Sequence, residues 1–208
     1  MEWPLFDLRL ACGPVSLRAV TDADAEELAA VLPDDLELDP HRERFPGLDP
    51  ARDRQRRFVQ GLWSSRGEWS PDSWCLDLRV DTADGAVGVQ TLEGDHFGQL
   101  RTVDTASWLV PSERGRGLGV AMRTAVLGLA FDHLGAIAAV SSAVLDNHAS
   151  LGVSRRLGYA DNGRSLIRTE SGPAELQHLR LTADQWRAGG HRVEVSGVDP
   201  CRPWFGVA

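Results

Sequence analysis

The chain has 208 residues, the length of one ordinary domain with a complete hydrophobic core. Hydrophobic residues make up 42% and charged residues 25%, as in globular proteins, and a net charge of -8 argues against a nucleic-acid partner bound through its phosphates. An acidic surface instead suits cationic or amine ligands. No segment reaches the ~18 apolar residues of a membrane span, and the N-terminus lacks the pattern of a secretory signal. We therefore expect a cytoplasmic protein with no membrane partner.

Three cysteines, Cys12, Cys75 and Cys201, are too few and too scattered for a metal site or a disulfide framework. Their odd number favours reduced thiols. We expect no metal site, and we expect the three side chains to be buried as small hydrophobic groups.

The first half of the chain alternates strand and helix patterns. Residues 15–20 alternate like a strand, and residues 22–32 have the acidic start and apolar spacing of a helix. Residues 33–50 are rich in Pro and Asp and are expected to form a loop, whose role the sequence does not reveal. The next expected elements are a helix at 51–63, a hairpin formed by 73–81 and 86–94, and a strand at 102–110.

The second half continues the alternation. Its expected elements are a helix from Val120 that stops before Gly135, a strand at 136–145, a helix at 147–157, and a hairpin of 159–169 and 174–182 that turns around Glu170, Ser171 and Gly172. This order predicts an α/β (α+β) fold, with a mixed central sheet of about six or seven strands and helices on both faces. We expect a single domain over residues 1–190. Residues 191–208 would form a tail, with Trp204 and Phe205, that docks on the domain or on the partner subunit of a homodimer.

The most informative segment is RGRGLG, residues 114–119, which lies between a strand that ends at Pro111 and the helix that starts near Val120. Its three glycines let backbone N–H groups approach a ligand at the positive end of the helix dipole, and its two arginines add charge, so the loop should bind an anion. A turn that merely caps the helix is the alternative. A dinucleotide fingerprint would need glycine where Val120 stands, and a P-loop would need lysine, which the chain lacks.

RGRGLG resembles the Arg/Gln-x-x-Gly-x-Gly/Ala acetyl-CoA signature of the GNAT N-acetyltransferase superfamily, with Arg114, Gly117 and Gly119 at the signature positions. Residues 146–159, DNHASLGVSRRLGY, resemble the second signature of that family, an Asn that opens a helix ending in Gly-Tyr or Gly-Phe. The Asn-x-x-Ser spacing looks most like the RimJ/RimL-type branch, which includes ribosomal-protein N-terminal acetyltransferases. The resemblance covers residues 15 to 181 and implies the GNAT fold, with acetyl-CoA and no metal.

The resemblance also implies which residues would hold the coenzyme. In this family a break in strand pairing frees a backbone N–H for the thioester carbonyl, here at Leu109 or its neighbours, and the same backbone would pair with the pantetheine arm. Asn147 and Ser150, three residues apart on one helix face, would meet the other side of that arm. The expected coenzyme-binding residues are Trp108, Leu109, Val110, Arg114, Gly115, Arg116, Gly117, Leu118, Gly119, Val120, Asn147 and Ser150.

Acyl transfer needs a base, because an alkyl amine with a pKa near ~10 is mostly protonated at neutral pH. Asp104, on the strand before the loop, is the candidate base, unless it is solvated or pairs with an arginine. Many GNAT enzymes place a Tyr seven residues after the Asn to protonate the departing thiolate, but Ser154 stands there. Ser150 is the preferred substitute and Ser154 the second, each positioning the sulfur or relaying a proton from water. A simple helix-terminus hydrogen bond is the alternative role for Ser150, and we expect Tyr159 in the core.

Residues for the acceptor are harder to find. Trp63, Trp69 and Trp74 cluster in the region where such folds shape the acceptor cleft, although tryptophans are more often core residues. Glu93 could attract an amine, as could the nearby Glu68, Asp72 and Asp95.

These patterns predict an acyl-CoA-dependent N-acyltransferase that works by direct attack in a ternary complex. Acetyl-CoA would be the donor, and a primary amine of a peptide N-terminus or a small molecule would be the acceptor. One alternative is a succinyl-CoA-dependent enzyme of the same fold, which an arginine near the thioester would favour. Another is a noncatalytic acyl-CoA-binding sensor.

Overall fold

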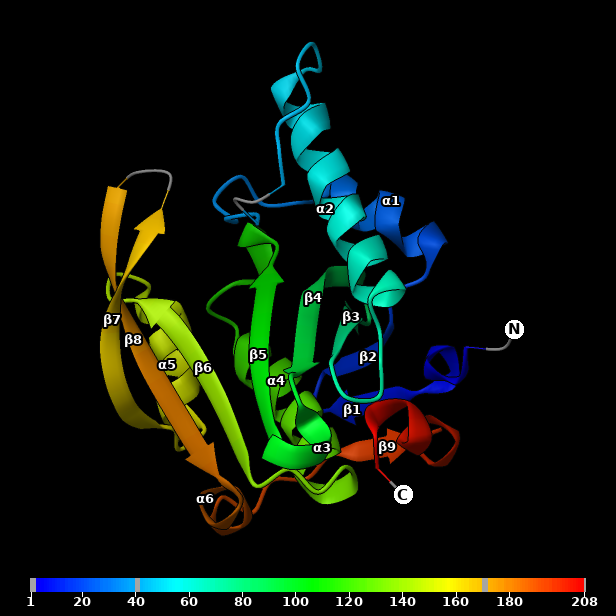
Figure 1. The fold of residues 1–208 in the computed structure, drawn as a ribbon, viewed down its shortest axis with the longest axis vertical. Helices are drawn as coiled ribbons and strands as arrows, with labels where there is room; N and C mark the ends of the chain where they lie inside the picture. The colour runs from blue at the N-terminus through cyan, green and yellow to red at the C-terminus, as the bar shows by residue number, and fades with distance from the viewer. Residues whose placement is uncertain (1–2, 40–41, 170–171, 208) are drawn as a thin grey trace.

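The computed structural model describes residues 3–39, 42–169 and 172–207. Within them, nine strands form one sheet in the order β7-β8-β6-β5-β4-β3-β2-β1-β9, shown in Figure 1. Neighbouring strands are antiparallel, except that β5 and β6 are parallel. The strands are β1 (Arg9–Cys12), β2 (Val15–Ala19), β3 (Trp74–Thr82), β4 (Gly85–Gly94), β5 (Thr102–Leu109), β6 (Ala138–Val144), β7 (Ala160–Thr169), β8 (Gly172–Thr182) and β9 (Glu194–Ser196).

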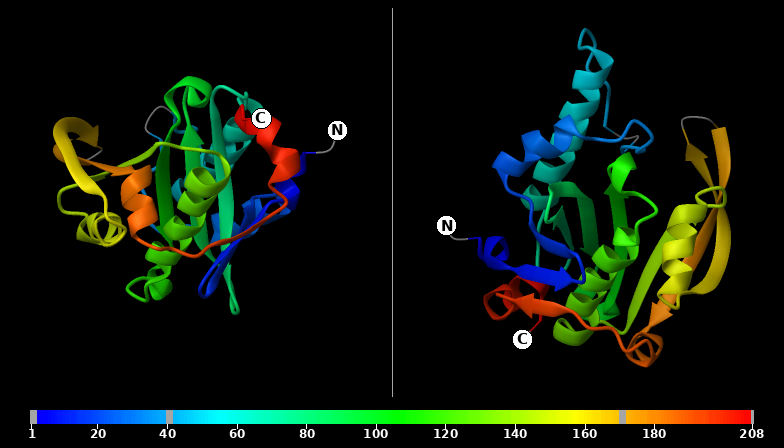
Figure 2. Two further views of the ribbon diagram at one scale, coloured as in Figure 1. Left: turned by 90° about the horizontal axis from the view of Figure 1, so that it is seen from below. Right: turned by 180° about the vertical axis from the view of Figure 1, so that it is seen from behind.

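Helices cover both faces of the sheet (Figures 1 and 2). One face carries α1 (Asp22–Ala30) and α2 (Pro50–Gly67), and the other carries α4 (Leu118–Gly128) and α5 (His148–Arg156). The remaining elements are short: η1 (Pro4–Asp7), α3 (Phe97–Leu100), η2 (Pro111–Glu113), the π-helical turn η3 (Leu129–His133), α6 (Ala183–Ala188) and η4 (Asp199–Phe205). None of the helices in the described residues is both long and apolar enough to cross a membrane.

Local side-chain signals explain where the two helices of the first face begin. Thr21 caps α1 in a capping box, in which the Thr21 N–H donates to Asp24 Oδ2 at 2.8 Å and the Thr21 hydroxyl accepts from the Asp24 N–H. Asp49 caps α2 by accepting from two backbone N–H groups, and Pro50 follows at the first helical position. These caps fix the residues at which α1 and α2 begin, and Asp49 also fixes the end of the loop that leads into α2.

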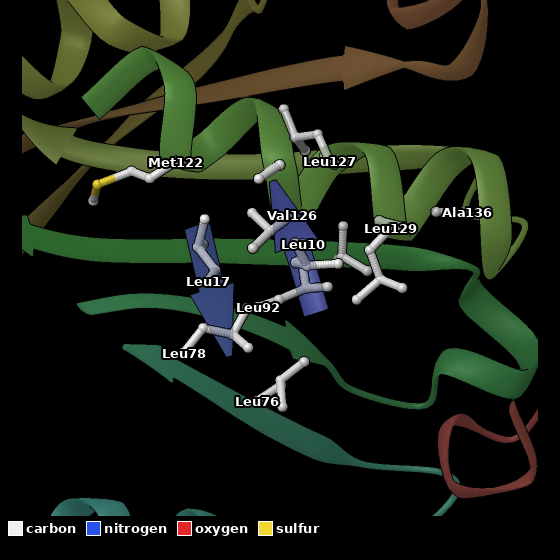
Figure 3. Packing of buried hydrophobic residues seen from close by; sticks show 14 of the residues in the cluster. Leu10, Leu17, Leu76, Leu78, Leu92, Met122, Val126, Leu127, Leu129 and Ala136 are labelled. Carbon is white, nitrogen blue, oxygen red and sulfur yellow. The ribbon is translucent and has the colours of Figure 1, made fainter. Parts of the chain in front are cut away.

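The main core lies between α4 and the sheet, as Figure 3 shows. Leu10, Leu17, Leu78 and Leu92 come from four different strands, and each is at most 1% exposed. They pack in one cluster with α4 side chains such as Val126, so α4 is held by its apolar face rather than by its helix propensity. A smaller cluster under α1 and α2 contains Val20, Leu28, Phe58, Leu62 and Val89.

The predicted fold class is confirmed, with a larger sheet than the six or seven strands expected. The added strands are β1 and β9, which are only four and three residues long and pair with each other through Leu10 and Val195. Such short segments have too little alternation to predict a strand, so their pairing is decided by tertiary contact. Of the turn residues expected in the last hairpin, Glu170 and Ser171 lie outside the described residues.

The C-terminal segment of the chain packs against the sheet and the N-terminal segment of the same chain. Cys201 and Phe205 are fully buried, whereas Cys12 and Cys75 are only partly buried. The Trp204 ring lies 4.7 Å from the Trp3 ring between centroids, which joins the two ends of the chain.

Candidate functional site

Strands β5 and β6 separate after a short paired stretch, as Figure 1 shows. They pair only over Thr102–Asp104, although β5 continues beside β4 to Leu109. The Val110 N–H donates to the Val87 carbonyl at 2.9 Å, so the alternation of the ladder turns the N–H groups of Ser107 and Leu109 toward the gap. The expectation that Val110 or Trp108 offers a free N–H is therefore wrong. The Val110 N–H is bonded to β4, and the Trp108 N–H, two residues earlier, points the same way.

The glycine-rich loop opens the positive end of α4. Gly115 and Gly117 have φ angles of 75° and 86°, a region that side chains other than glycine occupy only with strain, and no atom lies within 4 Å of where their Cβ atoms would be. Gly117 is the N-cap of α4, and its carbonyl accepts from the N–H groups of Val120 and Ala121. The N–H groups of the first turn have no partner inside the helix. This arrangement fits a phosphate group.

The two arginines of the loop already have partners. Arg114 binds Asp35 with both terminal nitrogens, at 2.6 and 2.8 Å, and its Nε donates to the Leu109 carbonyl at 3.0 Å. Arg116 binds Glu113 at 2.6 Å. The Arg114 guanidinium lowers the pKa of the Asp35 carboxyl. These exposed ion pairs are worth at most about 1 kcal/mol, so a phosphate could replace either carboxylate.

Helix α5 begins at the predicted asparagine. Asn147 is its N-cap, and the Asn147 side-chain oxygen accepts from the Ser150 N–H at 3.0 Å. Ser150 is partly exposed, whereas Ser154 is fully buried. The Ser154 hydroxyl donates to the Ser150 carbonyl at 3.3 Å and accepts from Arg123 Nη1 at 2.7 Å. Ser154 thus belongs to the interior, which corrects its assignment as a group that reaches the sulfur.

Arg123 is a buried cation that sequence reasoning missed, because it lies inside the apolar pattern of α4. It is 3% exposed, and burial lowers its pKa. Arg123 Nε, Thr105 Oγ1 and Tyr159 Oη have no partner of ordinary hydrogen-bond geometry among the described residues. Burial also raises the pKa of Tyr159 to about 12, and its position in the core confirms the prediction.

Three carboxylates lie near one another on the face of the sheet that α2 covers, opposite to the face that carries α4 and Arg123. Glu93 of β4 lies directly across from Asp104 of β5, and Asp77 of β3 lies across from Thr91, two residues before Glu93. The Thr91 hydroxyl donates to Asp77 Oδ1 at 2.8 Å. Within the described ranges, none of the three carboxylates forms an ion pair, so the pairing of Asp104 with an arginine is not observed. We call Asp77, Glu93 and Asp104 the carboxylate group.

The surroundings of the carboxylate group favour its neutral form. Loss of water around Glu93 raises its pKa to about 7, and the charges of Asp104 and Asp77 contribute to the rise. Burial raises the pKa of Asp77 and of Asp104 as well. The sequence suggested Glu93 and Asp104 separately, but their contact across two strands needs the register of the sheet. No set of three or more His, Cys, Asp or Glu side chains in the described part of the chain is placed to hold a metal ion.

A cleft of about 540 Å³ lies between α2, residues 36–39 and 42 of the loop before α2, and strands β3 to β5. Asp77 and Glu93 lie on its floor with Trp108 of β5, and Phe58 of α2 forms part of its wall. Burial raises the pKa of Cys75, which also lines the cleft, so this thiol is not an activated nucleophile.

The three tryptophans predicted to bind the acceptor do not line this cleft. Trp63 is 54% exposed on α2, and Trp74 is 3% exposed. Trp69 stacks on Trp74 with 5.9 Å between ring centroids, and its indole N–H donates to the Trp204 carbonyl. Phe205 packs against both rings. The assignment of Trp69 and Trp74 is corrected to an aromatic core, which exists because the C-terminal segment folds back onto this end of the sheet.

Comparison with solved structures places the fold among acetyltransferases. The structure of Mycobacterium smegmatis RimJ in complex with CoA-disulfide is 22% identical with a TM-score of 0.67, and the match covers 93% of this chain and 99% of that one. A SpeG spermidine N-acetyltransferase chimera from Vibrio cholerae and hSSAT is 12% identical with a TM-score of 0.62, over 84% of this chain and 99% of that one. A GNAT-family acetyltransferase from Bacillus anthracis is 13% identical with a TM-score of 0.64, over 85% and 99%.

The sequence itself matches a family model. Residues 15–160 match the family described as acetyltransferase (GNAT) domain, and this match includes the glycine-rich loop, the carboxylate group and α5. Because the match covers more than half of the chain, the protein belongs to the GNAT acetyltransferase family.

Proposed function

We propose that this protein is an acetyl-CoA-dependent N-acetyltransferase of the RimJ/RimL-type branch and that Glu93 accepts the proton of its amine acceptor. The observation that supports this proposal most directly is the carboxylate group. Asp77 and Glu93 line the cleft, and none of the three carboxylates forms an ion pair among the described side chains. Unpaired carboxylates attract an ammonium ion, and a carboxyl with a pKa of about 7 can take up its proton at neutral pH.

The residues present fit acetyl-CoA, which would supply an acyl group activated as a thioester. The open space at Gly115 and Gly117, the first turn of α4 and the side chain of Arg116 would hold its pyrophosphate. The backbone of β5 that faces the gap would pair with its amide groups. Asn147 and Ser150 would meet the arm from the other side.

Glu93 replaces Asp104 as the proposed base, and Asp104 becomes its partner. Both residues are exposed, and they lie directly opposite each other on neighbouring strands. The negative charge of Asp104 helps to keep the Glu93 pKa high enough for proton uptake. Among these two groups, Glu93 is the one that lines the cleft.

The acceptor we propose is a primary amine on a peptide N-terminus or a small molecule. Structures of the same fold include a spermidine N-acetyltransferase chimera, so a small amine acceptor is compatible with this architecture. Two alternatives would use the same coenzyme site as the proposed enzyme. A succinyl-CoA-dependent enzyme would differ in its acyl donor, and a noncatalytic sensor would bind acyl-CoA without turnover.

The test combines coenzyme binding with turnover. We expect calorimetry to show binding of acetyl-CoA, with succinyl-CoA and free CoA for comparison. We expect Glu93→Gln to lower kcat by about 100-fold or more while acetyl-CoA affinity is unchanged, because only proton transfer is removed. Glu26→Gln, an exposed change on α1, is the matched control and should keep full activity. Absence of coenzyme binding would contradict the proposal, and full turnover in Glu93→Gln would contradict the base.

A further inference from the structure

The cleft has a second charged end, which the proton-transfer chemistry does not use. Arg57, Gly61 and Ser65 are spaced four residues apart on one face of α2, and all three line the cleft. Ser65 lies against Asp77, at the end that holds the carboxylate group. Arg57 lies two turns nearer to the start of the helix, a rise of about 12 Å. Helical side chains lean toward the N-terminus, which increases this separation.

Arg57 is a buried cation that forms no ion pair among the described residues. Its charge helps to lower the pKa of Asp53, one turn earlier on α2, but that carboxylate is bound by Arg56 and by the Phe45 N–H. Arg57 is 7% exposed, its Nη2 donates to the Asp39 carbonyl at 2.9 Å, and its Nε has no hydrogen-bond partner. The neighbouring Arg42 differs, because its Nε lies 3.6 Å from the Asp39 carboxylate. Glu37 is exposed where it lines the cleft and does not pair with Arg57. A buried cation without a directly bound counter-ion is costly, so the cleft can gain from an anion at this end.

Apolar side chains lie between the two charged ends. Phe58 and Leu62 of α2 face Val89 of β4 and Trp108 of β5 in one hydrophobic cluster, and the rings of Phe58 and Trp108 are 5.9 Å apart between centroids. Such a wall lowers the local dielectric and strengthens the attraction of an ion to either end. The cleft therefore presents negative charge, an apolar middle and positive charge in that order.

We propose that the acceptor is a dipolar molecule, whose amine meets the carboxylate group and whose own carboxylate, about 12 Å away, pairs with Arg57. This inference rests on the proposed function. An extended peptide covers about 3.3–3.6 Å per residue, so this spacing corresponds to three or four residues. The carboxylate belongs to the third or fourth residue of a peptide acceptor, as an acidic side chain or as a free C-terminus.

Matched peptides test the inference in the full-length protein with acetyl-CoA. The first pair is Ala-Gly-Gly-Gly as a free acid and as a C-terminal amide. The second pair is the amides of Ala-Gly-Glu-Gly and Ala-Gly-Gln-Gly. We expect kcat/KM to be about tenfold higher or more for at least one acid than for its neutral match, because a hydrogen-bonded ion pair is formed. The pair that shows the preference identifies the source of the carboxylate.

Variants on α2 identify the residue responsible. Arg57→Gln should abolish the preference, lowering kcat/KM for the acidic peptide about tenfold or more beyond any change that it causes for the neutral peptide. Arg52→Gln, which removes the same charge from an exposed position of the same helix, should keep the preference. Arg57→Lys retains the charge without the planar fork and should keep part of the preference, so it serves if the Gln variant does not fold.

Three results would overturn the inference. Equal kcat/KM for acidic and neutral peptides would remove the role of the carboxylate. An equal loss on both peptides in Arg57→Gln would show that Arg57 only holds the loop through the Asp39 carbonyl. A preference for succinyl-CoA over acetyl-CoA that Arg57→Gln abolishes would assign the carboxylate to the acyl group. Failure to bind any acyl-CoA would instead contradict the proposed function itself, so the two failures are distinguishable.

Discussion

The position of Glu93 in the carboxylate group lowers the stability of the folded protein at neutral pH, and the same position suits the side chain to proton transfer. Folding raises the pKa of Glu93 from 4.5 to about 7, so between these values the folded state binds more protons than the unfolded state. The free energy of unfolding therefore falls as the pH rises through this window. The same shift lets the side chain accept a proton near neutral pH, which an unperturbed glutamate would do poorly.

Removal of the neighbouring charge should move the pH profile. Asp104→Asn keeps the size of the side chain but removes one of the negative charges that hold the Glu93 pKa up. We expect the acidic limb of the kcat/KM profile to lie near pH 7 in the natural protein and to shift to lower pH in this variant. The measurement is kcat/KM against pH for both proteins at constant ionic strength. An unchanged limb would show that Asp104 does not act on the base.

At the scale of elements, the ion pair between Arg114 and Asp35 joins two parts that serve different ligands. Arg114 belongs to the glycine-rich loop in front of α4, and Asp35 belongs to the loop between α1 and α2 that borders the cleft. The same arginine also binds the Leu109 carbonyl at the gap between β5 and β6. A phosphate that attracts Arg114 competes with Asp35, so coenzyme affinity and the position of the acceptor loop are linked.

Loss of that competitor should strengthen coenzyme binding. We expect Asp35→Asn to lower the Kd for free CoA by a few-fold, since an exposed ion pair is worth up to about 1 kcal/mol. Arg114→Ala should raise the Kd. Titration calorimetry at low salt measures both changes, and Asp34→Asn is the matched control on an exposed neighbour. If Asp35→Asn does not bind CoA more tightly and Arg114→Ala does not bind it more weakly, Arg114 is excluded from the coenzyme site.

At the scale of the whole molecule, the two ends of the chain complete the sheet and its core. β9 pairs with β1 at the sheet edge, and Phe205 fills the space beside Trp74 at 4.8 Å between ring centroids. Loss of either contact would expose buried apolar side chains to water, which is unfavourable. The C-terminal segment therefore supports the end of β3 that leads into the carboxylate group.

Truncation of the Phe205 ring should destabilise the protein strongly. Phe205→Ala removes a fully buried aromatic side chain, so we expect the free energy of unfolding to fall by about 3–5 kcal/mol. Urea unfolding followed by tryptophan fluorescence measures the change, and Glu194→Ala, at an exposed position of β9, is the control with an expected change within about 0.5 kcal/mol. A loss below about 1 kcal/mol would show that the segment contributes little to the core.

Local patterns in the sequence determined the fold class, the order of the main elements and the glycine-rich loop with its following helix. These features depend on residues close together in the chain: the apolar spacing of α4, the three glycines before it and Asn147 at the start of α5. The tertiary structure alone decided which distant residues meet. The register of β3, β4 and β5 brings the carboxylate group together, and the C-terminal segment buries Trp69 and Trp74. Arg57 becomes a cleft residue only when α2 packs over the sheet. The burial of a side chain, and the contact between like charges in the carboxylate group, both depend on packing between segments that are distant in the sequence.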